Sequence, residues 1–261
     1  MPIDIKGAAE IEAMQESCLL AAACLRMASS HVRPGITTEK LNALCHEYIL
    51  DHGAIPAPLN YNGFPKSICT SINHVVCHGI PNDKEVLRDG DIINVDVTTI
   101  LHGFHGDTSR TFYVGDNVAD EARHVTEVAR ESLDLGIAVV RPGARIREIG
   151  AAIEDYAHAQ NCSVVRDYCG HGIGRVFHTD PQIAHYRSRG PNPRMRVGMT
   201  FTIEPMINIG TWRTRLLSDG WTVETLDREL SAQFEHTLLV TETGVDIMTD
   251  WAKLEGSKYD A

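Results

Sequence analysis

The sequence predicts an α/β fold of the α+β kind, with two similar halves packed face to face around a shared centre. The prediction rests on an internal repeat. Val-Arg-Pro-Gly at 32–35 returns at 140–143. A glycine turn and β-rich run at 87–96 returns at 195–204 with the same offset, and each copy ends on a carboxylate, Asp96 or Glu204. Chance explains one short match, but two blocks in the same order at one offset favour a true repeat.

Each Val-Arg-Pro-Gly string precedes a predicted amphipathic helix. The Pro-Gly pair ends the preceding helix, and apolar residues then recur at helical spacing. These residues are Leu41, Leu44, Cys45 and Tyr48 in the first copy and Ile149, Ala152, Ile153 and Tyr156 in the second. We therefore expect a single domain over residues 1–261, with halves over roughly 32–115 and 140–241.

A second acidic strand is predicted in each half. Asp107 precedes the β-rich run at 111–114, and Glu235 precedes the run at 237–240. These two acids are further apart in the chain than the offset of the repeat requires. We therefore expect an insertion in the second half, around 211–227.

Composition narrows the class of protein. The 261 residues are 43% hydrophobic with a net charge of −11, which fits a globular protein and argues against a sequence-specific nucleic-acid binder. The apolar run 18–25 is shorter than the ~20 residues that cross a bilayer, and the N-terminus has no signal-peptide pattern. Seven cysteines without a C-x-x-C pair are typical of reduced thiols. We expect a cytoplasmic protein without membrane contact.

Four carboxylates that lie in apolar strands need partners that offset their negative charge. Buried carboxylates repel one another and lose hydration, so they require protons or metal ions. Two acids from each half favour a pair of divalent cations bridged by oxygen ligands.

Three of the 13 histidines are candidate site residues because they lie in glycine-flanked or strand-like strings: His78, His171 and His178. His102 and His105 are expected at a solvated hairpin tip. Six others lie in polar or helical contexts that predict surface positions: His31, His46, His52, His124, His158 and His185.

The sequence resembles the type I methionine aminopeptidases, a branch of the pita-bread metallopeptidases. Six strings carry the resemblance in the family's order: Cys-His-Gly-Ile-Pro (77–81), Asn-Val-Asp-Val (94–97), Gly-Asp-Thr-Ser-Arg-Thr-Phe (106–112), Gly-His-Gly-Ile-Gly (170–174), Phe-Thr-Ile-Glu-Pro (201–205) and Ser-Ala-Gln-Phe-Glu-His-Thr (231–237). The resemblance implies a pita-bread fold, with two pseudo-symmetric halves, an antiparallel sheet flanked by helices and a central dinuclear metal site.

The resemblance also implies the roles of the site residues. The metal ligands would be Asp96, Asp107, His171, Glu204 and Glu235, with Asp107 and Glu235 bridging two ions. The metals in such a site are Co, Mn, Fe, Zn or Ni. His78 and His178 would contact the scissile amide. A water or hydroxide shared by the two cations would be the nucleophile, with Glu204 as acid/base.

The substrate implied by the resemblance is a peptide or nascent chain that begins with methionine and has a small second residue. The methionine pocket would contain Tyr61, Phe64, Cys69, Phe177 and Trp221, together with the two catalytic histidines. Pro58 stands where many bacterial relatives carry cysteine, and Phe64 where tyrosine is common, yet both keep the wall apolar. Some relatives bind a monovalent cation, which would map to Asn73, Val75 and Ser231.

The segment 185–196 is basic in an otherwise acidic chain. Its arginines, Arg187, Arg189, Arg194 and Arg196, suggest a contact with ribosomal RNA, although a solvated loop explains them equally well. We expect a monomer.

Other interpretations remain open at this point. A proline-selective aminopeptidase shares the fold but usually carries a further N-terminal domain, and here the repeat begins by residue 32. The short segment between His178 and Glu204 leaves no room for the extra subdomain of type II methionine enzymes. A non-catalytic pita-bread factor that binds ribosomes or proteins would lose metal ligands, and a mononuclear iron oxygenase would leave the additional acids unexplained.

Overall fold

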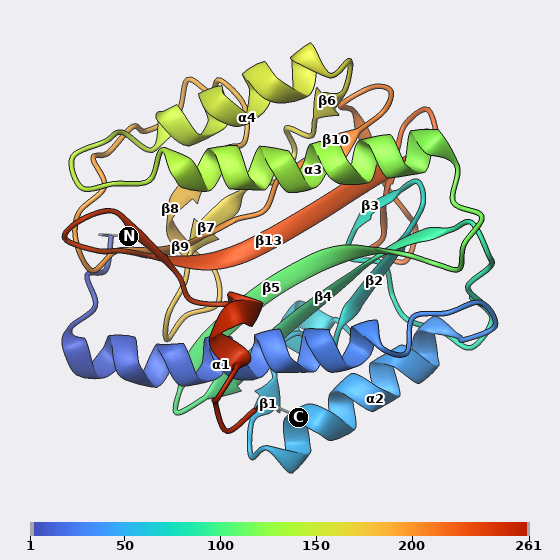
Figure 1. The fold of residues 1–261 in the computed structure, drawn as a ribbon, viewed down its shortest axis with the longest axis horizontal. Coiled ribbons are helices and arrows are strands. Elements are labelled where there is room, and N and C mark those ends of the chain that lie inside the picture. Colours follow the sequence, from blue (N-terminus) through green and yellow to red (C-terminus); the bar gives the residue numbers. More distant parts are fainter. Residues whose placement is uncertain (1–2, 260–261) are drawn as a thin grey trace.

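One large sheet, to which both halves of the sequence contribute, runs through the centre of the molecule (Figure 1). The computed structural model describes residues 3–259. The main path of the sheet is β1-β4-β5-β13-β9-β7-β8, and neighbouring strands along it are antiparallel. Its eleven strands are β1 (Ile55–Pro56), β2 (Cys69–Ile72), β4 (Ile92–Leu101), β5 (Phe104–Tyr113), β6 (Ser163–Val164), β7 (Gly170–Gly172), β8 (Thr179–Ile183), β9 (Thr200–Ile203), β10 (Met206–Asn208), β13 (Ser231–Val240) and β14 (Val245–Ile247).

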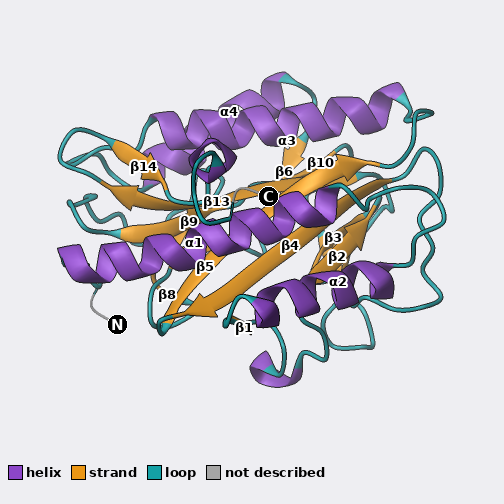
Figure 2. Cartoon of the chain, turned by 60° about the horizontal axis from the view of Figure 1, so that its bottom comes forward, coloured by secondary structure: helices purple, strands orange, loops and turns teal. Residues whose placement is uncertain are grey.

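Each half of the molecule contributes two α-helices. They are α1 (Ala8–Ser29) and α2 (Thr38–Asp51) in the first half and α3 (Asp120–Ala138) and α4 (Arg147–Ala159) in the second. Helix α1 lies across β4 and β5, as Figure 2 shows, and α3 packs on β13. Helices α2 and α4 pack against α1 and α3 respectively. The predicted α+β architecture, an antiparallel sheet flanked by helices from both halves of the sequence, is therefore confirmed.

The two helices predicted from the repeat are present. The Thr37 side chain accepts a hydrogen bond from the Lys40 N–H and caps the first turn of α2. In both helices the predicted apolar stripe is the buried face, with Leu41 and Cys45 fully buried in α2 and Ile149 and Ile153 in α4.

A glycine allows α1 to approach the sheet closely. A Cβ atom at Gly106 of β5 would lie 2.5 Å from the backbone nitrogen of Cys18 in α1. In the same contact between α1 and the sheet, the Ser17 hydroxyl lies 2.9 Å from the Thr99 hydroxyl of β4. The absence of a side chain at residue 106 therefore fixes how near the helix lies to the strands that carry Asp96 and Asp107.

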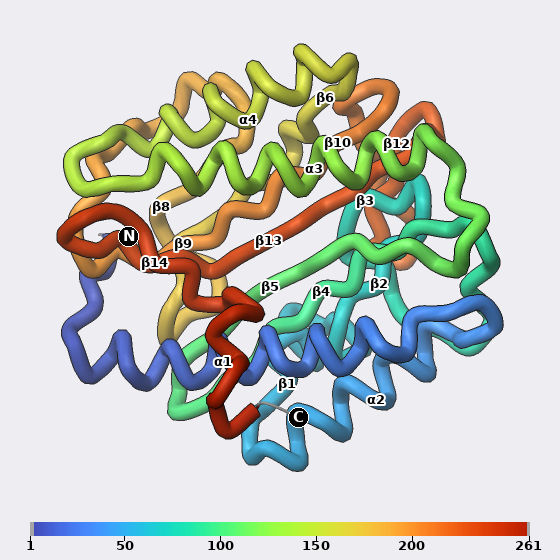
Figure 3. Tube along the Cα trace, viewed as in Figure 1, coloured from blue at the N-terminus to red at the C-terminus, as the bar shows by residue number. Residues whose placement is uncertain are grey.

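The insertion predicted around 211–227 forms a β-hairpin. Strands β11 (Thr214–Leu216) and β12 (Val223–Thr225) pair with each other, and β12 also pairs with β3 (Val75–Cys77) in a separate three-stranded sheet. Figure 3 shows β12 beside β3, although the two segments are far apart in the chain.

Two short 3-10 helices complete the described elements: η1 (Tyr61–Gly63) and η2 (Trp251–Leu254). Helix η2 packs on α1, and the Arg26 guanidinium donates a hydrogen bond to the Tyr259 carbonyl. None of the described helices is both long and apolar enough to cross a membrane.

One local expectation was wrong. Asp96 was expected at the end of its strand, but it lies inside β4, which continues to Leu101 because the run 97–101 is also β-rich and pairs with β5.

Candidate metal centre and its cavity

The five predicted ligands come together over the middle of the large sheet. Asp96 lies in β4, Asp107 in β5 and Glu235 in β13, and these three strands are consecutive in the sheet. His171 lies in β7, and Glu204 directly follows β9. All five side chains line one cavity of about 320 Å³.

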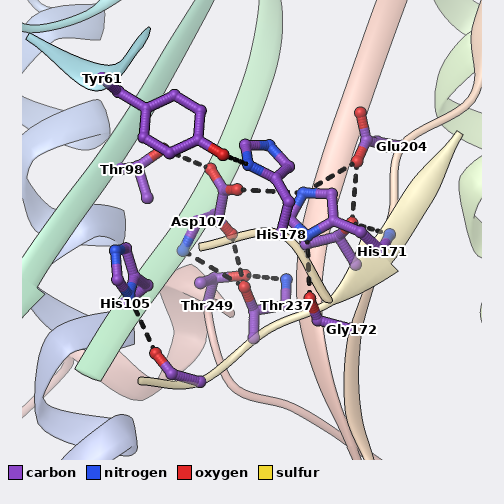
Figure 4. A network of polar contacts seen from close by, with 12 residues as sticks. Tyr61, Thr98, His105, Asp107, His171, Gly172, His178, Glu204, Thr237 and Thr249 are labelled. Atoms are coloured by element: carbon purple, nitrogen blue, oxygen red, sulfur yellow. Dashed lines mark hydrogen bonds and ion pairs between the residues drawn. The ribbon is translucent and has the colours of Figure 1, made fainter. Parts of the chain in front are cut away.

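The distances at this centre are those of a group that can share a cation. Ligand atoms of Asp107, His171 and Glu235 lie within 4.8 Å of one another. Nε2 of His171 is 3.7 Å from Oδ2 of Asp107 and 3.6 Å from Oε1 of Glu204, as Figure 4 shows.

Burial gives the four carboxylates unusual protonation behaviour. Loss of hydration raises the pKa of Asp107 to about 7. Burial, reinforced by the charge of Asp107, also raises the pKa values of Asp96, Glu204 and Glu235. No lysine or arginine among the described residues lines the cavity to offset these charges.

An unpartnered oxygen shows that the donor set fits a cation. Oδ1 of Asp96 is buried and has no hydrogen-bond partner among the described residues. A divalent ion supplies what this oxygen and the crowded carboxylates lack, because hard cations prefer carboxylate oxygen and borderline ones also accept imidazole.

Side-chain hydroxyls and an amide orient the carboxylates. Thr98 donates to Oδ1 of Asp107 at 2.7 Å, and Thr202 donates to Oε1 of Glu204 at 2.8 Å. The side-chain amide of Gln233 lies 3.3 Å from Oε2 of Glu204. Such hydrogen bonds limit the rotation of the Asp107 and Glu204 carboxylates, which both line the cavity.

The histidines of the cavity are neutral at pH 7. Burial lowers the pKa of His171 to about 3 and that of His78 to about 4. Burial, with a smaller effect of the His78 charge, lowers the pKa of His178 to about 4. Neutral imidazoles can bind a metal or donate a hydrogen bond without carrying charge.

The side chains predicted for a methionine pocket surround the same cavity. They are Tyr61, Phe64, Cys69, Phe177 and Trp221, together with His78 and His178. Phe64 and Trp221 meet edge to face at 5.2 Å between ring centroids. Trp221 is supplied by the inserted hairpin, at the turn between β11 and β12.

Sequence reasoning missed several residues of the cavity. They are Thr98, Asp167, Tyr168, Cys169 and Met206, while Pro58 was noted only as a departure. Thr98 follows the Asn-Val-Asp-Val string, and Cys169 precedes Gly-His-Gly-Ile-Gly, so both lie beside strings that were used. The signal for Thr98 and Cys169 is therefore their position directly beside these two strings.

Two histidine expectations were wrong. His105 does not lie at a solvated tip: it is 8% exposed, its backbone N–H donates to the Gly174 carbonyl, and its ring stacks on Phe177. His185 is not a surface residue: it is 1% exposed, and its Nε2 accepts a hydrogen bond from the Glu204 N–H at 3.1 Å. Helix α4 packs over the segment that carries His185, and this burial has no local signature in the sequence.

Two of the three residues predicted to bind a monovalent cation, Asn73 and Ser231, are in contact in the structure. The Ser231 N–H donates to the Asn73 carbonyl at 2.9 Å, and Val75 begins β3 two residues further on. The Ser231 hydroxyl and Oδ1 of its cross-strand partner Asn208 are buried without a hydrogen-bond partner among the described residues.

The four arginines of the 185–196 segment are exposed. Arg187 forms an ion pair with Asp155 of α4, and Arg194 donates to the Gly143 carbonyl. The Arg145 guanidinium donates to the Asn192 carbonyl and the Arg147 guanidinium to the Gly190 carbonyl, so two further arginines contact this segment.

Comparison with known proteins agrees with this geometry. The profile of metallopeptidase family M24 matches residues 12–242. Methionine aminopeptidase A of Synechocystis sp. is 59% identical over 92% of this chain and 94% of its own length. The methionine aminopeptidase of Escherichia coli K12 is 52% identical over 95% of this chain and 94% of its own. The crystal structure of methionine aminopeptidase from Rickettsia prowazekii superposes with a TM-score of 0.92 at 55% identity, covering 95% of this chain and all of that one.

Proposed function

The chain belongs to metallopeptidase family M24, and we infer that it removes the N-terminal methionine of proteins and peptides in a metal-dependent reaction. The observation that carries this function is the single cavity in which buried carboxylates meet an apolar, aromatic wall. Identity of 52–59% with methionine aminopeptidases favours this activity over that of proline-selective enzymes of the same fold.

Five residues would hold two divalent cations: Asp96, Asp107, His171, Glu204 and Glu235. Asp107 and Glu235, from neighbouring strands of the sheet, would be shared by both ions. The unpartnered Oδ1 of Asp96 and the raised carboxylate pKa values support this proposal. Co, Mn, Fe, Zn and Ni all suit such ligands, so availability would select among them. Bound ions of this kind lower the pKa of a water molecule and polarise a carbonyl group.

Glu204 would move the proton of the reaction. Its carboxylate lines the cavity, and Thr202 and Gln233 orient it through one hydrogen bond to each of its oxygens. It would take a proton from the attacking water and return it to the departing amine.

His178 and His78 would stabilise charge that develops on the scissile amide. Both rings line the cavity, and both are neutral because burial lowers their pKa values to about 4. A neutral imidazole can donate its N–H to a developing oxyanion without losing a proton to solvent.

The methionine side chain would lie against Tyr61, Phe64, Cys69, Phe177 and Trp221. Aromatic faces and a thiol make favourable contacts with a thioether. A small second residue is expected because the remaining space of the 320 Å³ cavity is bounded by the sheet and its acids.

The Glu204→Gln variant tests this assignment. We expect it to lose more than about 100-fold in kcat for methionine release from Met-Ala-Ser, since general acid–base groups contribute 10²–10⁴-fold. Calorimetry should still detect metal binding, because the other four ligands remain. Turnover near that of the unmodified protein would remove Glu204 from the proposed role.

A monovalent cation would be held by the backbone carbonyl oxygens of Asn73, Val75 and Ser231 as a structural ion, with the Ser231 hydroxyl as a further ligand. The buried Ser231 hydroxyl has no hydrogen-bond partner among the described residues, which supports this proposal. Melting temperatures in K⁺, Na⁺ and tetramethylammonium chloride at equal ionic strength test it. We expect K⁺ or Na⁺ to stabilise the protein, and the Ser231→Ala variant to respond less. Equal melting temperatures in the three salts would contradict the site.

The substrates would include nascent chains in the cytoplasm, with the protein acting as a monomer. All seven cysteines are free, which supports a reducing compartment.

The ribosome would be contacted by four exposed arginines: Arg187, Arg189, Arg194 and Arg196. Arg-to-Glu substitutions at 187, 189 and 194 should weaken ribosome co-sedimentation and its dependence on salt. Unchanged, salt-insensitive binding would reject the contact.

A further inference from the structure

A buried histidine outside the cavity holds the backbone of Glu204. His185 is 1% exposed and does not line the cavity. Its Nε2 accepts the hydrogen bond of the Glu204 N–H at 3.1 Å. The ring therefore touches the proposed acid/base residue through the main chain and not through its carboxylate.

The Glu204 peptide needs such a partner because the strand is interrupted there. Strand β9 ends at Ile203, and β10 begins at Met206. Pro205 lies between them and has no N–H, so the regular ladder with β13 stops at this point. On the other side the Gln233 side-chain amide lies 3.4 Å from the Glu204 carbonyl oxygen. Side chains thus replace the ladder on both sides of residue 204.

His185 is itself fixed by α4. A Cβ atom at Gly150 would lie 2.4 Å from the carbonyl oxygens of both Ala184 and Tyr186, so the helix packs directly on the backbone around His185. The Arg187 N–H donates to the Glu154 carboxylate of the same helix at 3.0 Å. The backbone on both sides of His185 is therefore held by a helix, which limits where the imidazole can lie.

We propose that His185 is a positioning residue that fixes the Glu204 peptide and, through it, the direction in which the Glu204 carboxylate meets His171 and the cavity. The inference rests on the proposed function of Glu204. Without the acceptor, the part-buried Glu204 N–H is left unpaired and the peptide rotates to find another partner. Its carboxylate then leaves the place 3.6 Å from His171. Loss of comparable supporting hydrogen bonds costs about 10–100-fold in metal affinity or activity.

Three substitutions separate positioning from packing. His185→Leu removes the acceptor and fills much of the space. His185→Gln keeps an acceptor oxygen at about the reach of Nε2, whereas His185→Asn is one methylene too short. The matched control is His124→Leu, because the imidazole of His124 also bonds a main-chain group, the Gln160 carbonyl, far from the cavity.

Each variant is measured in two ways. Steady-state kcat and KM for Met-Ala-Ser are determined at saturating Mn²⁺, and the dissociation constant of Mn²⁺ is determined by calorimetry on metal-free protein. We expect His185→Leu and His185→Asn to lose about 10–100-fold in kcat with less than a threefold change in KM, and to bind Mn²⁺ more weakly. We expect His185→Gln to recover most of both, and His124→Leu to match the unmodified protein.

The outcomes distinguish the two proposals. If unmodified protein releases methionine and all His185 variants keep its kcat and Mn²⁺ affinity, the positioning role is wrong while the function stands. If His185→Gln and His185→Asn lose activity to the same extent, and the loss is not specific to kcat, then His185 serves only the packing of the protein. That result also overturns the inference. If unmodified protein releases no methionine, the proposed function itself fails. Should His185→Leu not fold, the comparison of Gln with Asn still decides.

Discussion

The hydroxyl of Tyr61 lies 2.8 Å from Nδ1 of His178. A phenol can donate to an imidazole nitrogen, and in the tautomer in which Tyr61 donates, the His178 proton is on Nε2. Tyr61 follows Asn60, which has φ of 67°, and precedes Asn62, with φ of 47°. These left-handed conformations carry a backbone cost that asparagine tolerates better than most residues, and the tight turn holds the phenol over the imidazole.

Tyr61→Phe should therefore lower kcat more than it changes KM. The ring that would contact the methionine side chain remains, but the orientation of His178 is lost. One neutral hydrogen bond corresponds to roughly a tenfold effect. Kinetics with Met-Ala-Ser measure it, and Tyr113→Phe, which removes a surface hydroxyl bonded to Glu127, is the control. A raised KM with unchanged kcat would show that Tyr61 serves substrate binding alone.

At the scale of elements, the β11–β12 hairpin carries Trp221 to the cavity, and a polar cluster attaches it to the chain beside β3. The carboxylate of Glu224 accepts hydrogen bonds from Arg215 at 2.7 Å and from His74 at 3.2 Å. The Thr225 N–H also donates to the His74 carbonyl at 3.0 Å. Because Glu224 is largely buried, these bonds are shielded from solvent.

Glu224→Gln should loosen this attachment and move Trp221. We expect KM for methionine peptides to rise severalfold, with a smaller change in kcat, because the acids and histidines lie on other elements. The matched control is Glu242→Gln, at an exposed position. An unaltered KM would mean that packing of Trp221 on Phe64 alone fixes the hairpin.

A second prediction about the elements concerns the contact between α1 and β5. Gly106→Ala introduces a Cβ that would lie 2.5 Å from the α1 backbone, so helix and strand must separate. Overpacking of this kind costs about 1–3 kcal/mol, seen as a lower melting temperature. Gly244→Ala is the control, because a Cβ there meets no atom within 4 Å. Equal melting temperatures for the two variants would contradict the close approach.

At the scale of the whole molecule, the buried carboxylates of the cavity lower the stability of the metal-free protein. Asp107 ionises near pH 7 in the folded chain instead of near its ordinary 3.8, so the folded state binds more protons than the unfolded state between these values. The stability of metal-free protein therefore falls through this window as pH rises, and the cost is complete above pH 7.

Asp107→Asn should raise the stability of the metal-free protein at pH 8 by at least about 1 kcal/mol. The gain should shrink at pH 5.5, where the native carboxyl is protonated. Added Mn²⁺ should reverse the order, because only the unmodified protein keeps both oxygens for the ion. Melting curves of both proteins at the two pH values, with and without Mn²⁺, test this. A pH-independent difference would contradict the raised pKa.

Much of this molecule could be predicted from its sequence because similar strings recur in it at a constant offset. The constant offset of the repeat predicted both helices that follow Val-Arg-Pro-Gly. The different spacing of Asp107 and Glu235 predicted the inserted hairpin. Short-range patterns suffice for such features, since helix faces and strand runs are local.

The positions of His105 and His185 could not be predicted in this way. Both lie in polar local contexts, and their burial depends on elements distant in the chain, Phe177 for one and α4 for the other. The Tyr61–His178 bond likewise joins residues that are far apart in the sequence. Tertiary packing decides such contacts, and no periodicity in one sequence reports it.

The most direct test of the whole account is peptide hydrolysis by protein stripped of metal and then supplied with Mn, Co or Fe in steps. The substrates are Met-Ala-Ser, Leu-Ala-Ser and Ala-Pro-Ala. We expect metal-dependent release of methionine, with little leucine or alanine. Release of alanine from Ala-Pro-Ala alone, or no hydrolysis despite bound metal, would contradict it.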